Sequence, residues 1–227
     1  MRFGLTQIAL GIALGALAAS LGGPAWLLAW PALSVAIVGA AYLGYGPRVF
    51  GKRADGRLSI AHVALLWPYY AVAWGLWQIK SRVRDERPYD EVAPGILVGR
   101  RPLDAAEMPA DARLVVDLTS EFPRSPTTRA VARYECLPTL DTDAPDLASF
   151  RALLARLEHE EGPIFVHCAM GHGRSATVAG GLMVRRGHAA DADDAIRRMT
   201  EARPLVYLHD VQRRALRAVL KRPEGES

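Results

Sequence analysis

Long apolar runs dominate the N-terminal part of the chain, and short apolar runs alternate with polar segments in the remainder. Residues 3–21 carry no charge over a length sufficient to cross about 30 Å of hydrocarbon as a helix. A second such run, residues 25–45, follows a Gly-Gly-Pro sequence that is typical of a turn. The pattern predicts a helical hairpin whose tip lies on the far side of a membrane. The competing interpretation of the first run is a cleaved signal peptide, but the second run follows it almost immediately.

Residues 60–79 form a third apolar run, which contains Pro68 and several Trp and Tyr residues. Aromatic side chains of this kind favour the membrane interface, so the run is predicted either to span the membrane or to lie in the headgroup region. Basic residues flank it on both sides, namely Arg48, Lys52, Arg53 and Arg57 before it and Lys80, Arg82, Arg84 and Arg87 after it. An interfacial helix keeps both clusters in the cytoplasm, as the positive-inside rule favours. A full span, with the rest of the chain in the periplasm, stays open.

Small residues recur at four-residue spacing in the first two runs. They are Gly11 and Gly15 in the first run and Ala32, Ala36, Ala40 and Gly44 in the second. Such stripes let two helix backbones approach closely. The alternative explanation is the ordinary abundance of alanine in this chain.

The remainder of the chain has the alternation of short apolar and amphipathic segments that is typical of an α/β domain. The expected fold class is α/β, with a central sheet flanked by helices and two or three membrane-spanning or interfacial helices before it. Strands are expected at residues 96–98, 113–118, 134–137 and 164–167, and helices at 147–160, 174–186, 191–202 and 208–220. The predicted organisation is a membrane region at 1–80, a linker at 81–88, a domain at 89–221 and a tail at 222–227.

The charge balance argues against one class of partner. The 227 residues carry a formal net charge of +4, but they contain no basic patch interleaved with aromatic residues and no zinc-ligand spacing, so nucleic-acid binding is not expected. Two cysteines, Cys136 and Cys168, are too few for the disulfide framework of a small secreted domain. A reducing compartment is therefore expected, in agreement with a cytoplasmic domain.

The segment from His167 to Ser175 combines a strand end, a loop with two glycines and the start of a helix. Backbone N–H groups of such a loop bind phosphate, and the following helix adds the positive end of its dipole. Cys168 at the start of the loop faces the same amides, which stabilise its thiolate and make it a nucleophile. Arg174 supplies a planar fork for phosphate oxygens, and Ser175 can donate a hydroxyl hydrogen bond to the sulfur.

The alternative for Cys168 is a buried structural residue beside a glycine turn, because cysteine often behaves as a small apolar residue. A lone C-x5-R spacing would carry little weight. Here the cysteine coincides with a histidine, two glycines, an arginine and a serine at fixed spacing between a strand and a helix. This combination favours catalysis.

Residues 167–175 resemble the signature H-C-x-x-G-x-x-R-S/T of the cysteine-dependent protein tyrosine phosphatase superfamily, and of its dual-specificity branch in particular. Residues 95–102, 114–122 and 195–212 look like the opening strand, the next strand with its loop and the closing helices of that family. The resemblance covers residues 89–221. It implies a phosphocysteine mechanism that requires no metal or cofactor. It also implies that His167 orients a phosphate-binding loop formed by Ala169, Met170, Gly171, His172, Gly173 and Arg174.

Hydrolysis also needs an acid that protonates the leaving oxygen and then a base that activates water. The segment between an expected strand and an expected helix offers Asp141, Asp143 and Asp146. The resemblance to family members with an Asp-x-x-x-Pro loop implies Asp141, and Asp143 stays as the alternative acid. Asp146 directly precedes the expected helix and is predicted to cap it.

Two roles stay open for His172, a positive charge near the phosphate and an exposed loop residue. The histidines outside this loop show no metal-ligand spacing. No metal is therefore expected.

The site restricts the substrate to a phosphomonoester, because the loop binds the phosphate and the surrounding walls bind the rest. A membrane tether and nearby basic residues favour a lipid phosphate such as phosphatidylglycerophosphate. Lipid-acting members of the family often have a basic residue after the nucleophile, where this chain has Ala169, so a phosphoprotein substrate is the alternative. A phosphate-binding module without turnover is a third hypothesis.

Overall fold

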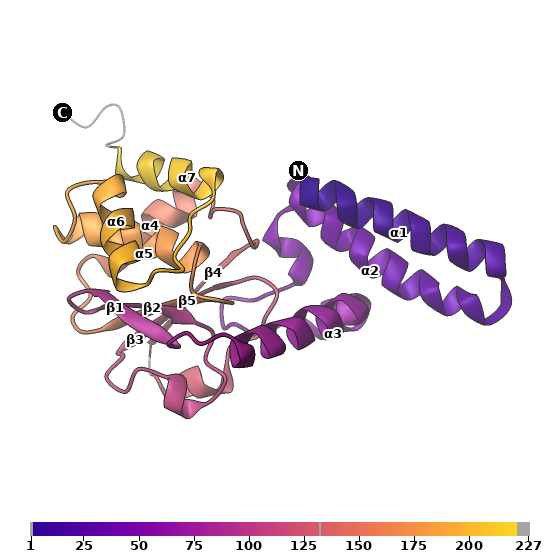
Figure 1. Ribbon diagram of the computed structural model, residues 1–227, viewed down its shortest axis with the longest axis horizontal. Coiled ribbons are helices and arrows are strands. Elements are labelled where there is room, and N and C mark those ends of the chain that lie inside the picture. Colours follow the sequence, from indigo (N-terminus) through magenta and orange to yellow (C-terminus); the bar gives the residue numbers. More distant parts are fainter. Residues whose placement is uncertain (1, 132, 222–227) are drawn as a thin grey trace. The chain divides into compact units, whose positions relative to one another are not determined.

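The structure is a computed structural model that describes residues 2–131 and 133–221 (Figure 1). The expected tail, residues 222–227, lies outside the described residues. The chain divides into two compact units. The helical unit comprises Met1–Val83 and Ser120–Pro123, and the sheet unit comprises Arg84–Thr119 and Arg124–Ser227.

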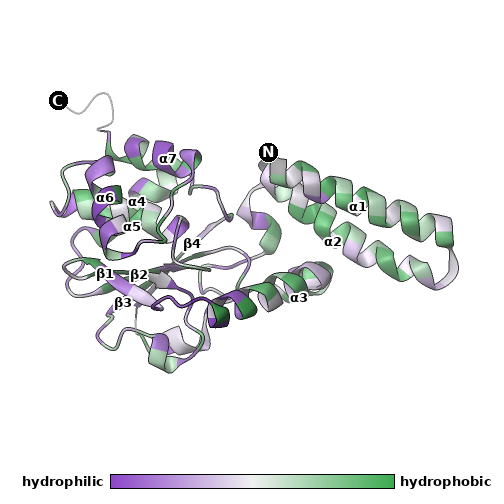
Figure 2. Cartoon of the chain, viewed as in Figure 1, coloured by the Kyte–Doolittle hydropathy of each residue, from purple (hydrophilic) through white to green (hydrophobic). Residues whose placement is uncertain are grey.

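The helical unit consists of α1 (Arg2–Leu21), η1 (Gly23–Leu28), α2 (Ala29–Ala40), η2 (Ala41–Tyr45), η3 (Pro47–Phe50) and α3 (Ile60–Val83). Among the described residues, Phe3–Leu21 and Gly23–Tyr45 are long and apolar enough to cross a membrane, and Figure 2 shows hydrophobic colouring along α1 and α2. The second segment is not the single α-helix expected over 25–45. It begins as a 3-10 helix and ends in a π-helical turn, because Gly22, Gly23 and Gly44 adopt positive φ angles at its two ends.

Glycine lets α1 and α2 approach each other closely. A Cβ built on Gly11 would lie 2.7 Å from the carbonyl oxygen of Ala32, and one built on Gly39 would lie 2.8 Å from that of Gly4. A Cβ on Gly15 would meet no atom within 4 Å. The predicted small-residue contact is therefore confirmed at Gly11 and wrong at Gly15.

Pro68 interrupts the helical hydrogen-bond ladder of α3, because proline has no backbone N–H. Side chains of α2 bond to the α3 backbone at this point. The indole Nε1 of Trp30 donates to the carbonyl oxygen of Leu65 at 3.1 Å, and the backbone N–H of Tyr69 donates to Ser34 Oγ at 3.3 Å. These bonds fix α3 against α2 where its own ladder is broken.

The sheet unit contains a five-stranded mixed sheet in the order β1-β2-β5-β3-β4. The strands are β1 (Tyr89–Ala93), β2 (Ile96–Arg100), β3 (Leu114–Thr119), β4 (Arg133–Thr139) and β5 (Ile164–Cys168). β1 pairs antiparallel with β2, and all other neighbours pair parallel. The carboxyl ends of β2, β5, β3 and β4 therefore lie along one edge of the sheet.

Helices cover one face of this sheet, as Figure 1 shows. They are α4 (Leu147–Leu157), α5 (Arg174–Arg185), α6 (Ala192–Ala202) and α7 (Asp210–Leu220), and the short η4 (Ala105–Glu107) and η5 (Pro126–Ala130) complete the unit. Alternate strand residues such as Val98 and Val166 enter the main core with the helices. Leu97, Val115 and Phe165 form a smaller cluster, as expected from side chains that alternate between the faces of a strand.

Element ends differ from the sequence expectations by a few residues. β1 was not expected, because its polar residues bury only alternate side chains at the edge of the sheet. β4 continues through Pro138 to Thr139, and an edge strand tolerates proline. α6 begins at Ala192 because Asp191 caps it, and α7 begins at Asp210 after the cap His209. The structure also ends α4 at Leu157 and α5 at Arg185, slightly before the expected ends at 160 and 186.

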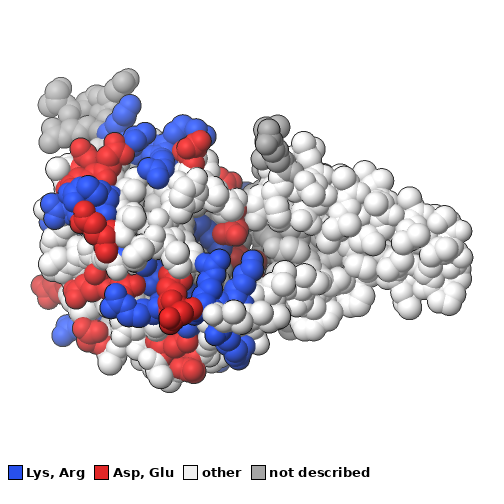
Figure 3. Space-filling view, viewed as in Figure 1, with Lys and Arg blue, Asp and Glu red and all other residues white. Residues whose placement is uncertain are grey.

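The predicted α/β fold class, a central sheet with packed helices and apolar helices before it, is confirmed. Figure 3 shows charged side chains of both signs on the sheet unit, whereas the visible surface of α1 and α2 is uncharged. The structure thus reproduces the division that the hydropathy pattern indicates.

Candidate active site

The signature segment leaves the middle of the sheet at the carboxyl edge of the parallel strands. Cys168 ends β5, where it pairs with Arg100 of β2, and His167 pairs with Asp117 of β3. A pocket of about 220 Å³ opens beside Cys168. Its other lining residues come from the loops that follow β4, β5 and α6 and from α7, and they include Asp141, His172, Leu205, Tyr207 and Gln212.

The loop after Cys168 turns the amide of Gly171 toward the sulfur. The backbone N–H of Gly171 donates to Cys168 Sγ at 3.2 Å, and the hydroxyl of Ser175 lies 3.5 Å from the same atom. The side chain of Cys168 is buried, with 3% of the residue exposed. The structure therefore brings together the cysteine, the glycine and the serine of the signature segment, as predicted.

Gly171 is required at its position for two separate reasons. Its φ of 76° lies in the left-handed region that other residues rarely adopt. A Cβ there would also lie 2.4 Å from the carbonyl carbon of Gly99 in β2. The loop can pass this close to the neighbouring strand only with glycine at position 171.

Arg174 begins α5, directly after the cap residue Gly173, so the loop runs into the positive end of a helix. Its side chain is 1% exposed. Nη1 donates to the carbonyl oxygen of Thr139 at 2.9 Å, and Nη2 lies 3.2 Å from Asp141 Oδ1. One end of the guanidinium is thereby fixed to the end of β4, and the other end reaches the pocket wall.

The three candidate aspartates occupy different environments. Asp141 lines the pocket, and its side chain is 66% exposed. The carboxylate of Asp143 accepts a hydrogen bond from the backbone N–H of Ala144 at 2.8 Å, and this residue is not among those that line the pocket. Asp146 caps α4 by accepting from Ser149 N, as predicted.

His167 is fully buried in β5. Its ring stacks on that of Phe165, with centroids 5.4 Å apart, and its Nδ1 lies 3.4 Å from the carbonyl oxygen of Cys168. These contacts hold the ring beside the first peptide unit of the loop, where a residue that orients the loop is expected.

His172 is not an exposed loop residue, since its side chain is only 18% exposed. Its Nε2 lies 2.9 Å from both carboxylate oxygens of Glu86. Burial of the ring lowers the pKa of His172 below its usual value, and the hydrogen bond and charge of Glu86 oppose this shift without reversing it. A neutral ring that bonds to a carboxylate through Nε2 carries its proton on that nitrogen.

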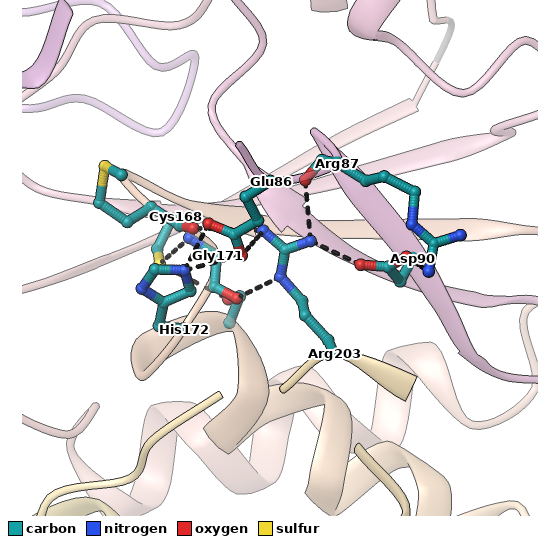
Figure 4. A network of polar contacts seen from close by, with 9 residues as sticks. Glu86, Arg87, Asp90, Cys168, Gly171, His172 and Arg203 are labelled. Carbon is teal, nitrogen blue, oxygen red and sulfur yellow. Dashed lines mark hydrogen bonds and ion pairs between the residues drawn. The ribbon is translucent and has the colours of Figure 1, made fainter. Parts of the chain in front are cut away.

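Arg203 supports the loop from the side opposite to the sulfur, as Figure 4 shows. Its guanidinium is buried and donates to the carbonyl oxygens of Gly171 at 3.1 Å and Met170 at 3.5 Å. It also contacts Glu86 at 2.6 Å and Asp90 at 2.7 Å. These supporting residues were not predicted from the sequence, because they come from segments far from the signature.

Gln212 of α7 was also missed. It is fully buried, its Oε1 accepts from His209 N at 2.9 Å, and its Nε2 donates to the carbonyl oxygen of Asp143 at 2.9 Å. The amide therefore links the start of α7 to the loop that carries Asp141. A glutamine three positions after a helix cap is a recognisable capping signal, but nothing in that pattern indicates the second bond.

Two exposed apolar side chains, Leu205 and Tyr207, form one part of the pocket rim. Leu205 is 48% exposed and Tyr207 is 62% exposed, and both line the pocket, whereas the intervening Val206 and the following Leu208 are buried. Among the described residues of the sheet unit, these two are the large hydrophobic side chains with high exposure. The segment therefore presents alternate apolar side chains to the mouth of the pocket.

Within the part of the chain that the structure describes, no group of three or more His, Cys, Asp or Glu residues is arranged to hold a metal ion. The groups in contact with Cys168 Sγ are the N–H of Gly171 and the hydroxyl of Ser175. Such donors bind an oxyanion directly.

Residues 92–222 match the family described as Swiss Army Knife protein, DSP-PTPase phosphatase domain. No curated protein matches the chain.

Several solved structures have a similar fold. PTPMT1 in complex with PI(5)P is 20% identical, with a TM-score of 0.50 over 58% of this chain and 94% of that one. The active form of Tk-PTP is 21% identical, with a TM-score of 0.52 over 58% and 95% of the two chains. The human tyrosine phosphatase-like serine/threonine/tyrosine-interacting protein is 18% identical, with a TM-score of 0.50 over 58% and 95%. At these identities the similarity concerns the fold alone.

Proposed function

Since the chain belongs to the Swiss Army Knife family of dual-specificity phosphatase domains, we propose that it hydrolyses phosphomonoesters through a phosphocysteine intermediate. The observation that carries this proposal is the environment of Cys168 Sγ. The sulfur is buried at a pocket, accepts the N–H of Gly171 at 3.2 Å and lies 3.5 Å from the hydroxyl of Ser175. Arg174 closes the same loop. A structural cysteine would need none of these groups.

In the first step, the thiolate of Cys168 attacks phosphorus, and the bond from phosphorus to the ester oxygen breaks. Asp141, as the acid, gives its proton to the leaving oxygen. Arg174 and the loop amides bind the phosphoryl oxygens, whose charge is spread in the transition state. The products of this step are an alcohol and a phosphocysteine.

In the second step, the carboxylate of Asp141 takes a proton from water, and the resulting hydroxide attacks phosphorus. The bond between sulfur and phosphorus breaks, and inorganic phosphate leaves. The hydroxyl of Ser175 donates to the departing sulfur and stabilises it as a thiolate. The 66% exposure of Asp141 supports this role, since the residue must exchange protons with the leaving group and with water.

For the substrate we favour a lipid phosphate. The apolar rim of Leu205 and Tyr207 lies at the mouth of a pocket whose floor binds a phosphate, which suits a molecule with a phosphate at one end and hydrocarbon at the other. The two apolar segments, Phe3–Leu21 and Gly23–Tyr45, support a membrane tether that would hold the pocket near such a substrate. Phosphatidylglycerophosphate is a suitable representative.

The proposed location of the sheet unit is the cytoplasmic side of the membrane. The basic clusters on both sides of residues 60–79 support this orientation under the positive-inside rule. A cytoplasmic location also keeps Cys168 in a reducing compartment.

A phosphotyrosyl protein is the second candidate substrate, and Tyr207 is the observation that favours it. An exposed aromatic ring at the pocket mouth can stack on the ring of a phosphotyrosine. The same residue thus serves either substrate, and only a comparison of the two separates them.

The test is phosphate release by the full chain in detergent micelles from phosphatidylglycerophosphate and from a phosphotyrosyl peptide. Cys168→Ser is expected to abolish release, and Arg174→Ala to lower kcat/KM by about 10² to 10³. Release mainly from the peptide would make the chain a protein phosphatase. Release from neither, combined with retained binding of a phosphate mimic, would make it a phosphate-binding module.

The apolar rim is tested with Leu205→Ser and Tyr207→Ser, compared with Leu205→Met and Tyr207→Phe. The serine variants should raise KM for the micellar lipid by about tenfold each, because each side chain loses roughly 1.5 kcal/mol of apolar contact. Glycerol 3-phosphate, which has the phosphate without acyl chains, should be hydrolysed equally by all variants. Equal losses with both substrates would argue against lipid contact at the rim.

A further inference from the structure

Glu86 lies in the short segment between the end of α3 and the start of β1, outside the matched residues 92–222. Its side chain is nevertheless only 10% exposed, and its carboxylate contacts two residues that lie within the matched range. It lies 2.9 Å from Nε2 of His172 in the phosphate-binding loop and 2.6 Å from Nη2 of Arg203 (Figure 4). Its exposed neighbour Asp85 makes no such contact among those described.

Arg203 joins this segment to the loop. Its side chain is 1% exposed, and Nη1 donates to the carbonyl oxygen of Arg87 at 3.0 Å and to Asp90 at 2.7 Å. The same guanidinium donates to the carbonyl oxygens of Met170 and Gly171. One buried cation therefore holds residues of the 86–90 segment and two consecutive peptide units of the loop.

Because the peptide bond is planar, the contacts of Arg203 with the loop carbonyls also orient the N–H groups that follow them. In a trans peptide unit the C=O and the following N–H point in opposite directions. When Arg203 holds the carbonyl of Met170, the N–H of Gly171 points away from Arg203, and there it donates to Cys168 Sγ at 3.2 Å. When Arg203 holds the carbonyl of Gly171, the N–H of His172 is likewise turned away from Arg203.

A buried guanidinium needs its partners. Loss of one partner from a buried ion cluster leaves the remaining charge incompletely compensated and is strongly destabilising to that arrangement. Without Glu86, Arg203 would retain Asp90 as its carboxylate partner, and His172 would lose the acceptor that holds its ring. The position of both groups against the loop therefore depends on Glu86.

We propose that Glu86 is a positioning residue for the phosphate-binding loop: it fixes His172 directly and, through Arg203, aims the loop amides at Cys168 and at the bound phosphate. This inference rests on the proposed function of the same site. Its consequence is that Glu86, a single residue of the segment before β1, supports the geometry of the catalytic site without touching the substrate.

The experiment compares Glu86→Ala and Glu86→Gln with the matched control Asp85→Asn in the full chain in detergent micelles. Asp85→Asn removes a carboxylate charge from the adjacent, exposed position. The measurements are kcat and KM with 4-nitrophenyl phosphate and the affinity for tungstate, a phosphate-sized oxyanion, by titration calorimetry. Thermal midpoints are measured in parallel, so that a loss of folded protein is recognised.

Glu86→Ala is expected to lower kcat/KM by about 10- to 100-fold, because misplacement of reacting and binding groups by about 1 Å has effects of this size. Its tungstate affinity should fall with kcat/KM. Glu86→Gln keeps an oxygen acceptor for His172 and Arg203 and should lie between Glu86→Ala and the wild type. Asp85→Asn should match the wild type in every measurement.

The inference would be overturned if the folded fraction of Glu86→Ala kept wild-type kcat, KM and tungstate affinity, since Glu86 would then contribute to stability alone. If Glu86→Ala fails to fold, Glu86→Gln decides, and values equal to those of Asp85→Asn overturn the inference. A wild-type chain without Cys168-dependent turnover would refute the proposed hydrolysis instead. In that case the tungstate affinities of the variants still test the role of Glu86.

Discussion

The groups around the pocket differ sharply in exposure. Cys168 and Arg174 are almost fully buried, whereas the side chain of Asp141 is 66% exposed. The roles proposed for them, nucleophile and phosphate clamp, need a fixed geometry, which burial among packed neighbours supplies. A proton donor must instead meet both a leaving group and water, and an exposed side chain can reach both.

Asp141→Asn should lower kcat most for alkyl phosphates, by about 10² to 10⁴, because an alkoxide leaving group needs protonation more than a nitrophenolate does. The measurement is kcat for a series of alkyl and aryl phosphates. Asp143→Asn is the matched control, since its carboxylate bonds to the adjacent Ala144 N–H. If Asp143→Asn shows the strong dependence on leaving group, Asp143 is the acid.

Gly171→Ala should destabilise the sheet unit by about 2–5 kcal/mol, from a left-handed backbone together with the clash against Gly99. Gly187→Ala separates the two effects. Gly187 has a φ of 72°, but a Cβ there meets no atom within 4 Å, so its cost should be only about 1–2 kcal/mol. Urea unfolding followed by pulse proteolysis measures both variants, and equal costs would contradict a steric role for the strand.

At the scale of elements, the apolar helices contact one another through glycines and through side-chain hydrogen bonds to the backbone, whereas the strands of the sheet pair through their backbones. α1 and α2 approach through Gly4, Gly11 and Gly39, and α2 contacts α3 through Trp30 and Ser34 at the Pro68 break. Apolar surface alone does not drive helices together in a lipid environment, where tails are as apolar as leucine. With the proposed membrane tether, close backbone approach and specific hydrogen bonds would determine how these helices pack.

Gly11→Leu should weaken the α1–α2 contact by about 1–3 kcal/mol, because the added side chain enters space occupied by Ala32 and Ala36. Gly15→Leu is the control in the same helix, where a Cβ meets no atom within 4 Å. All five tryptophans lie between Trp26 and Trp77, so tryptophan fluorescence during a titration with sodium dodecyl sulfate reports on the helical unit alone. Equal midpoints for the two variants would contradict the packing described above.

Element types were largely predictable from sequence, whereas element ends were not. The strands of the parallel sheet are apolar runs, so hydropathy locates them. β1 is polar and was missed, because an edge strand forms by pairing and does not need a continuous apolar run. The helical run expected over 25–45 is present as Gly23–Tyr45, but its ends are 3-10 and π-helical, because hydropathy does not register that Gly22, Gly23 and Gly44 change the backbone conformation.

For the molecule as a whole, the signature segment was visible because its residues are contiguous. Cys168, Gly171, Arg174 and Ser175 lie within one strand-loop-helix unit, and the structure brings them together as expected. Glu86, Arg203 and Gln212 support this unit from distant parts of the chain, and their sequence neighbourhoods contain no pattern that points to the loop. Long-range pairing of single polar residues is therefore the part of the site that only the folded structure provides.

The stability of the sheet unit should fall as the pH drops from 7 to 5, in part because of His172. Burial holds the pKa of His172 below its usual value of about 6.5, so below that pH the unfolded chain binds a proton that the folded chain resists. His172→Gln should reduce the slope of the free energy of unfolding against pH, by at most about 1.4 kcal/mol per pH unit. Urea midpoints at pH 5, 6 and 7 measure the effect, and an unchanged or steeper slope would contradict it.

Because Cys168 is buried and lines the pocket, chemical modification of its sulfur can show whether a ligand occupies the pocket, without turnover of a substrate. The residue is 3% exposed, and an alkylating reagent reaches its sulfur through the same pocket as a phosphate ester. A bound oxyanion should therefore shield it from modification, while the partly buried Cys136 on β4 serves as an internal reference. The ratio of label at Cys168 to label at Cys136, measured by mass spectrometry, would then report the fraction of pockets that hold a ligand.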